Sequence, residues 1–187
     1  MKKVIAALNL SKIFGLAAFV LGASLFTAGS VQAQEVTGRM CAISGYLSFQ
    51  GPLTAEDGAH EVYGEATISA CTDENGPVEG AEAVVSFTGS GIANCALQSF
   101  SLTQFVQWTY GGLDFITLQP AIGDRAPLGA YKGSVNFGES AGYKVIMTAL
   151  SKEPLQTLSC LLGVEPMGTY NFSGVQIFAD AESSASL

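Results

Sequence analysis

Four cysteines and one histidine are the residues with the most reactive chemistry in this chain of 187 residues. The cysteines are widely separated along the sequence, whereas zinc sites need closely spaced ligand pairs such as C-x-x-C. A catalytic thiol needs a histidine to activate it, and His60 is the only one in the chain. The spacing therefore favours two disulfides, with no metal and no cofactor, among Cys41, Cys71, Cys95 and Cys160.

Four cysteines allow three pairings, and the sequence leaves the choice open. We favour Cys41–Cys71 with Cys95–Cys160, because the first pair would close a hairpin around the loop at 51–58. Cys41 lies on the apolar face of its strand, but Cys71 has the opposite parity from the apolar face of the next strand, which contains Val62, Ala66, Ile68 and Ala70. This pairing therefore needs a bulge or a strand end at Cys71.

Other patterns that suggest chemistry have simpler interpretations. His60, beside Glu61, lacks the partners of a Ser-His-Asp triad, and no G-x-S-x-G turn occurs. "GSGIAN" lacks the third glycine and the helix of a dinucleotide-binding loop, so we interpret it as a turn leading into Cys95. "CTDENGPVEGAE" offers oxygen ligands for calcium, although not at EF-hand spacing, from Asp73, Glu74, Glu79 and Glu82. No pair of the sixteen acidic residues stands out as a glycosidase pair, and we expect no enzymatic activity.

Apolar and polar residues alternate along most of the chain, and this alternation predicts β-strands. Any functional site must therefore be positioned by strands. In "FSLTQFVQWTY" one face contains Phe100, Leu102, Val106, Trp108 and Tyr110. Gly111-Gly112 then predicts a tight hairpin with "LDFITLQ". Six further runs alternate in the same way, and no stretch after Ala33 keeps a helical repeat over three turns. We therefore expect an all-β domain, a single antiparallel sandwich or small barrel of about 8–9 strands.

The clearest strand also supplies the candidate ligand-lining residues, Phe100, Val106, Trp108 and Tyr110. Inside a barrel they would line an apolar cavity, whereas in a sandwich they would be ordinary core, which is the interpretation we favour. An outer-membrane barrel would also show alternating strands. That class needs aromatic girdles and a last strand at the C-terminus, but this chain ends in the polar segment "DAESSASL".

The segment from Met1 to Ala33 has the layout of a secretory signal peptide. Lys2, Lys3 and Lys12 precede an apolar run at 13–26, which is short for a spanning helix of about 20 residues, and small residues lead to Ala33. We expect cleavage after Ala33, a β-domain at 34–180 and a flexible tail at 181–187. The protein would then be secreted or periplasmic, with no membrane span after cleavage.

The expected mature chain is strongly acidic. It keeps five of the eight basic residues and all sixteen acidic ones, so its formal net charge is 5 − 16 = −11. Such a surface repels phosphate backbones, so nucleic acid is excluded as a partner, and it disfavours a polybasic membrane contact.

Several motifs follow one another in a recognisable order. A strand opens on Cys41 and runs into "FQGPLT", a second cysteine follows at Cys71, and a third follows "FTGSGIAN". Trp108 then precedes a glycine turn, and "GAYKG" comes later. This order resembles a loose group of small exported, cysteine-bridged, β-rich bacterial proteins that is frequent in actinobacteria. The resemblance covers most of the mature chain and brings no activity and no catalytic residue with it.

The sequence as a whole predicts an exported non-enzymatic β-domain that acts in binding or in cell-surface structure. Its partner would be a protein or a small apolar ligand. One alternative is a small barrel that carries the apolar ligand. A second is a subunit of a surface filament or fimbria assembled by strand donation, although "QEVTGRM" is short for a donor strand.

Overall fold

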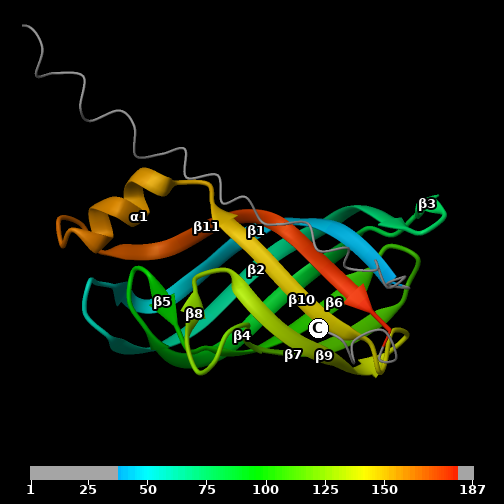
Figure 1. The fold of residues 1–187 in the computed structure, drawn as a ribbon, viewed down its shortest axis with the longest axis horizontal. Helices are drawn as coiled ribbons and strands as arrows, with labels where there is room; N and C mark the ends of the chain where they lie inside the picture. The colour runs from blue at the N-terminus through cyan, green and yellow to red at the C-terminus, as the bar shows by residue number, and fades with distance from the viewer. Residues whose placement is uncertain (1–37, 181–187) are drawn as a thin grey trace, which may run out of the picture. The chain divides into compact units, whose positions relative to one another are not determined.

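Eight long strands make up most of the part of the chain that the computed structural model describes, residues 38–180 (Figure 1). They are β1 (Gly38–Leu53), β2 (Gly58–Asp73), β4 (Ala83–Ala93), β6 (Ser101–Trp108), β7 (Leu113–Pro120), β9 (Ala130–Gly138), β10 (Lys144–Ser151) and β11 (Met167–Ala179). Three short pieces, β3 (Gly76–Pro77), β5 (Leu97–Gln98) and β8 (Ala126–Pro127), and the helix α1 (Pro154–Leu161) lie in the connections.

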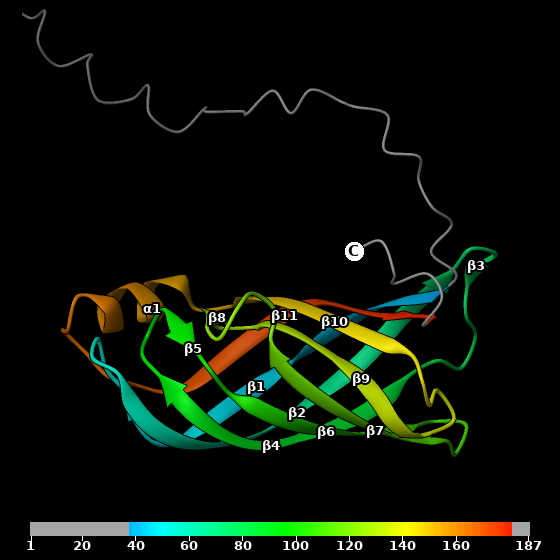
Figure 2. The same cartoon turned by 60° about the horizontal axis from the view of Figure 1, so that its bottom comes forward.

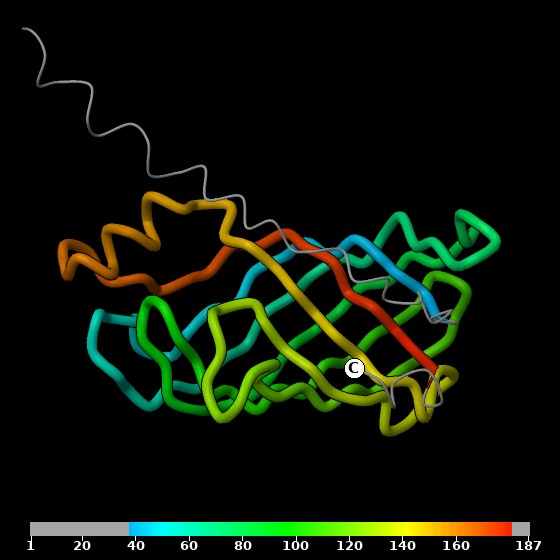
Figure 3. The backbone as a smooth tube through the Cα atoms, in the orientation of Figure 1, coloured from blue at the N-terminus to red at the C-terminus, as the bar shows by residue number. Residues whose placement is uncertain are grey.

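Each long strand pairs antiparallel with the next one along the chain, and β11 pairs with β1 to close the ring. The result is an up-and-down barrel of eight antiparallel strands, whose course is easiest to follow in Figure 3. The predicted all-β class is confirmed, and of the two architectures expected the barrel is the one adopted. A closed ring of this kind leaves none of the eight long strands with an unpaired edge.

The predicted strands all form, including the hairpin of β6 and β7 across Gly111, whose φ is 98°. The turn predicted at "GSGIAN" is wrong, because these residues continue β4 as far as Ala93. Glycine is needed here for a close strand approach, since a Cβ on Gly89 would clash with the Ser101 carbonyl oxygen of β6.

Apolar side chains point inward along every long strand and fill the barrel. Phe87, Tyr131 and Phe172 are among the largest fully buried side chains. The outer wall carries many hydroxyl side chains, such as Thr67, Ser86, Thr88, Thr103 and Thr148. Several large apolar side chains are also exposed there, among them Tyr63, Val84, Phe115, Phe137 and Leu150.

The interior also contains one polar pair. Gln104 of β6 and Gln176 of β11 are both completely buried and lie far apart in the sequence. Each amide nitrogen donates to the other side chain's oxygen, at 2.9 and 3.1 Å. The pair links two strands that are not neighbours in the sheet, so it ties the barrel together across its interior.

The two ends of the barrel differ (Figures 1 and 2). At the end that we call the capped end, α1, β5 and β8 lie in the connections between strands. At the other end, which we call the open end, the strands are joined by the β3 connection, the tight turn at 109–112 and the loop at 139–143.

Both expected disulfides form, Cys41–Cys71 and Cys95–Cys160. The bulge required by the first pair is present. Between Met40 and Ala42 of β1, the partner residues on β2 run from Thr72 to Ser69, so β2 has one extra residue. Ala70 takes up this residue with a φ of 48°, which turns Cys71 inward beside Cys41. Two disulfides are compatible with an extracellular or periplasmic location.

The expected signal peptide at 1–33, the cleavage after Ala33 and the tail at 181–187 lie outside the described residues. Within residues 38–180, the only helix is α1, and no helix is long and apolar enough to cross a membrane.

Candidate functional site

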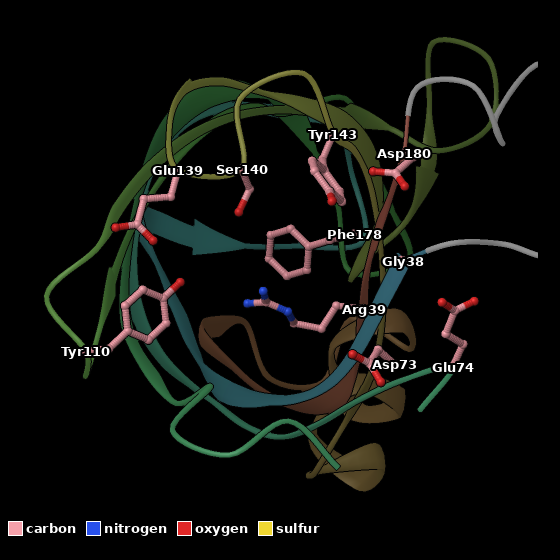
Figure 4. Close-up of a pocket in the computed structure, with 10 residues that line it drawn as sticks. All are labelled: Gly38, Arg39, Asp73, Glu74, Tyr110, Glu139, Ser140, Tyr143, Phe178 and Asp180. Atoms are coloured by element: carbon pink, nitrogen blue, oxygen red, sulfur yellow. The ribbon is translucent and has the colours of Figure 1, made fainter. Parts of the chain in front are cut away.

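A hollow of about 310 Å³ lies at the open end of the barrel (Figure 4). Figure 4 shows Arg39, Ser140, Tyr143 and Phe178 projecting into the space inside the ring of strands, with Glu74 outside the ring. The hollow is lined by Gly38, Arg39, Asp73, Glu74, Tyr110, Glu139, Ser140, Tyr143, Phe178 and Asp180. Larger hollows of about 570 Å³ lie over the strands of the outer wall.

Aromatic rings lie in and beneath the hollow. Trp108 is buried, and its ring centroid lies 5.8 Å from that of Phe178. Tyr110 stacks on Trp108 at 5.8 Å with the two ring planes 11° apart. The guanidinium carbon of Arg39 lies 5.1 Å from the centre of the Trp108 ring, which is within the range of a cation–π contact. The Trp108 ring is therefore already in contact with a cation of the protein itself.

A buried carboxylate holds the Trp108 ring and the loop above it in place. Asp114 is completely buried and accepts a hydrogen bond from the indole N–H of Trp108 at 2.8 Å. It also accepts hydrogen bonds from the backbone N–H and the hydroxyl of Ser140, both at 2.8 Å. Since Trp108 belongs to β6 and Ser140 to the loop at 139–143, Asp114 fixes two walls of the hollow relative to each other.

The rim of the hollow is acidic. The charged side chains that line the hollow are four carboxylates, from Asp73, Glu74, Glu139 and Asp180, and the guanidinium of Arg39. The hydrogen bond of Tyr143 to Asp180 raises the pKa of the Tyr143 hydroxyl, and burial adds to this effect. Burial also raises the pKa of Tyr110, where Glu139 acts in the same direction and Arg39 opposes it. Both tyrosines therefore stay neutral at physiological pH, and the hollow keeps an excess of negative charge.

The structure separates the four residues predicted to line a ligand cavity. Phe100 lies at the capped end, where its ring stacks on Phe49 at 5.8 Å. Val106 is buried in the core, and Trp108 is buried beneath the hollow at the open end. Only Tyr110, which is 51 % exposed, borders the hollow directly. Phe100 and Trp108 thus belong to different ends of the barrel.

Most of the residues that line the hollow were not predicted. Arg39, Glu139, Ser140, Tyr143, Phe178 and Asp180 come from strand ends and a turn that lie far apart in the sequence. The inward orientation of two of them could have been predicted from the alternation of their strands. Arg39 has the same parity as Cys41, and Phe178 has the same parity as Phe172, so both continue inward-facing rows.

The other sequence candidates have structural partners. His60 lies at the start of β2, near the capped end, and its Nδ1 forms a hydrogen bond of 3.0 Å with the Gly51 carbonyl oxygen. Asp73 and Glu74 of the acid-rich segment line the hollow, and Asp73 also accepts a hydrogen bond from the Asn75 backbone N–H at 2.8 Å. In the described part of the chain, no three His, Cys, Asp or Glu side chains gather as a metal site would require.

The one aliphatic hydroxyl of the hollow has a defined hydrogen-bond partner. It is that of Ser140, and this hydroxyl donates a hydrogen bond to the Asp114 carboxylate. The only histidine of the chain is at the other end of the barrel, so an imidazole does not activate Ser140. The remaining functional groups of the hollow are one guanidinium, four carboxylates and the aromatic rings of Tyr110, Tyr143 and Phe178.

Comparisons with protein-family models, with curated proteins and with solved structures found no match to this chain.

Proposed function

We propose that the protein is an exported binding protein without enzymatic activity, and that it holds a small organic cation at the open end of its barrel. The observation that carries this proposal is the composition of the hollow, whose lining combines four carboxylates and one guanidinium with aromatic side chains. Carboxylates attract an ammonium or guanidinium group, and aromatic faces stabilise it by cation–π contact.

Tyr110 and Tyr143 are the aromatic rings that a ligand in the hollow can reach. Trp108 is buried beneath them and already holds the guanidinium of Arg39, 5.1 Å from the ring centre, so a second cation would contact the two tyrosines. The volume of about 310 Å³ is near the lower limit of ligand pockets. The group that enters the hollow is therefore the size of a small amine.

The expected alternatives have less support. An apolar ligand inside the barrel would need space that side chains such as Phe87 and Phe172 occupy. A filament assembled by strand donation needs a gap in the sheet, but β2 pairs with β4 and β11 pairs with β1, so the eight long strands leave no gap.

Calorimetric titration of the mature chain tests the binding proposal. Agmatine and choline are the cationic probes, and succinate and glucose are the anionic and neutral ones. We expect saturable binding of the cations only, weakened about tenfold by Glu139→Gln, which corresponds to about 1.4 kcal/mol. Glu61→Gln removes a carboxylate from the outer wall and is the matched control. Tighter binding of succinate or glucose than of either cation, or no binding at all, would contradict the proposal.

Export has its own test. Intact mass is measured on protein from the culture medium and from the cell envelope, with and without reduction. A chain that starts at Gln34 and is four hydrogens lighter than its reduced form supports export and two disulfides. An uncut N-terminus or free thiols would contradict it.

A further inference from the structure

We propose that α1, at the capped end, is a lipid-contacting element that inserts its leucine side chains into the interface of a zwitterionic lipid layer. This site is independent of the hollow at the open end. It rests on the composition of the helix, on the way the helix is attached and on the size of its exposed face.

The exposed face of α1 is apolar and uncharged. Five side chains along the helix and the turn that follows it are between 42 and 79 % exposed: Leu155, Leu158, Leu161, Leu162 and Val164. No charged residue occurs from Pro154 to Val164, although the chain as a whole is strongly acidic. The leucines recur at helical spacing on one side, so together they form a continuous apolar ridge.

The helix is held in a way that directs this ridge outward. Cys160 is the only buried residue of α1, and it is bonded to Cys95 in the loop that follows β4. The helix is well terminated, since Pro154 stands at its start and Gly163, with a φ of 69°, follows its end. The backbone N–H groups of Gly163 and Val164 donate to the Cys160 and Ser159 carbonyl oxygens, both at 3.0 Å.

A covalent tether of this kind removes the need for apolar packing. An ordinary surface helix is held by burying its apolar side, whereas α1 buries a cystine and leaves its leucines on the surface. Contiguous apolar patches on a protein surface mark sites of contact with another protein or with a membrane. Figures 1 and 2 show α1 on the outside of the barrel end, where nothing in residues 38–180 covers it.

The ridge suits a lipid interface better than a second copy of the chain. Five side chains are far fewer than each partner contributes to a standard protein interface. A lipid–water interface needs no matching surface, and a protruding apolar ridge enters it directly. Since the ridge has no Lys or Arg and the protein is acidic, anionic lipids add no attraction, so zwitterionic lipids are the expected partner.

Vesicle flotation tests the proposal with oxidised full-length mature protein. We expect the protein to float with phosphatidylcholine vesicles, and we expect recovery in the lipid fraction to fall at least tenfold for Leu158→Asp/Leu162→Asp. Adding phosphatidylglycerol to the vesicles should not raise recovery. Val84→Asp is the matched control, because Val84 is 61 % exposed on the outer wall of β4, away from α1. Circular dichroism and intact mass establish that each variant is folded and oxidised.

Two results would overturn the proposal. The first is the absence of flotation, or equal flotation of the wild type and the leucine variant. The second is a dimer of the wild type in lipid-free buffer, seen by light scattering, that the leucine variant abolishes, because the ridge would then be an interface between copies of the chain.

Discussion

Single buried polar groups organise the interior of this barrel. Asp114 accepts three hydrogen bonds that join β6, β7 and the loop at 139–143. Gln104 and Gln176 satisfy each other in the middle of the core. In each case the polar atoms have specific partners, and a buried polar group without its partner costs about 1–3 kcal/mol. These residues therefore fix one arrangement of side chains inside the ring.

The glutamine pair gives a prediction at this scale. Gln104→Leu leaves the Gln176 amide buried without its partner, so we expect the free energy of unfolding to fall by about 2–3 kcal/mol. The double variant Gln104→Leu/Gln176→Leu replaces both partners with apolar groups and should regain most of the loss. Urea denaturation of the four proteins of this cycle measures the coupling, and additive losses would contradict the pairing.

Only some of the side chains at or near the hollow could be predicted from the sequence. Trp108 and Tyr110 were found because they continue a strand of strict alternation. Glu139, Ser140 and Asp180 carry no such signal, since they lie in a turn or at the end of a strand. They become neighbours of Arg39 only when β11 and β1 close the ring, and closure is a long-range event that local sequence patterns do not encode.

Among the structural elements, the bulge in β2 has the largest consequence for the fold. It lets β2 keep Val62, Ala66 and Ile68 on the inner face and still direct Cys71 inward. Ala70 is the extra residue that shifts the inward-facing positions of β2 by one. It is exposed and has a φ of 48°. Non-glycine residues adopt this left-handed region at a cost of roughly 1–2 kcal/mol.

Replacing this alanine tests the role of the bulge. We expect Ala70→Gly to raise the free energy of unfolding by about 0.5–1 kcal/mol, because the relief of strain outweighs the entropy that glycine loses on folding. Ala70→Val should lower it, since a β-branched side chain fits this region poorly. Thermal unfolding of the oxidised proteins compares the three, and a stabilised valine variant would show that the backbone does not adopt this conformation.

The strands were predictable from the sequence, whereas their closure into a barrel was not. Alternation in runs such as "CAISGYLSFQ" and the Gly111 turn identified the elements and the inner face of each. Sandwich and barrel share this pattern, and only the pairings of β1 with β11 and β2 with β4 distinguish them. The two-turn helix α1 is shorter than the repeat needed to detect a helix by periodicity.

At the scale of the whole molecule, the packed interior should make stability sensitive to alkaline pH. Burial raises the pKa of Tyr170 to about 12, and it also raises the pKa of Tyr131, whose hydroxyl is buried in the core. In the unfolded chain both groups ionise near pH 10. Their contribution to stability is therefore complete below pH 10 and is lost as the pH rises toward 12.

Urea denaturation across this range measures the effect. We expect the free energy of unfolding to be flat just below pH 10 and to fall between pH 10 and 12. The fall should be shallower in Tyr170→Phe, which cannot ionise at this position. A stability that does not change between pH 10 and 12 would mean that these hydroxyls are accessible to water in the folded protein.

The indole N–H signal of Trp108 in a nuclear magnetic resonance titration is the most direct measurement of cation binding at the open end. Trp108 is the only tryptophan, and its indole N–H donates to Asp114 directly beneath the hollow, so the protein gives a single indole signal at the site. On addition of agmatine, we expect this signal to shift saturably while the backbone signals of α1 stay in place. An indole signal that does not move, or shifts confined to the capped end, would contradict binding at the open end.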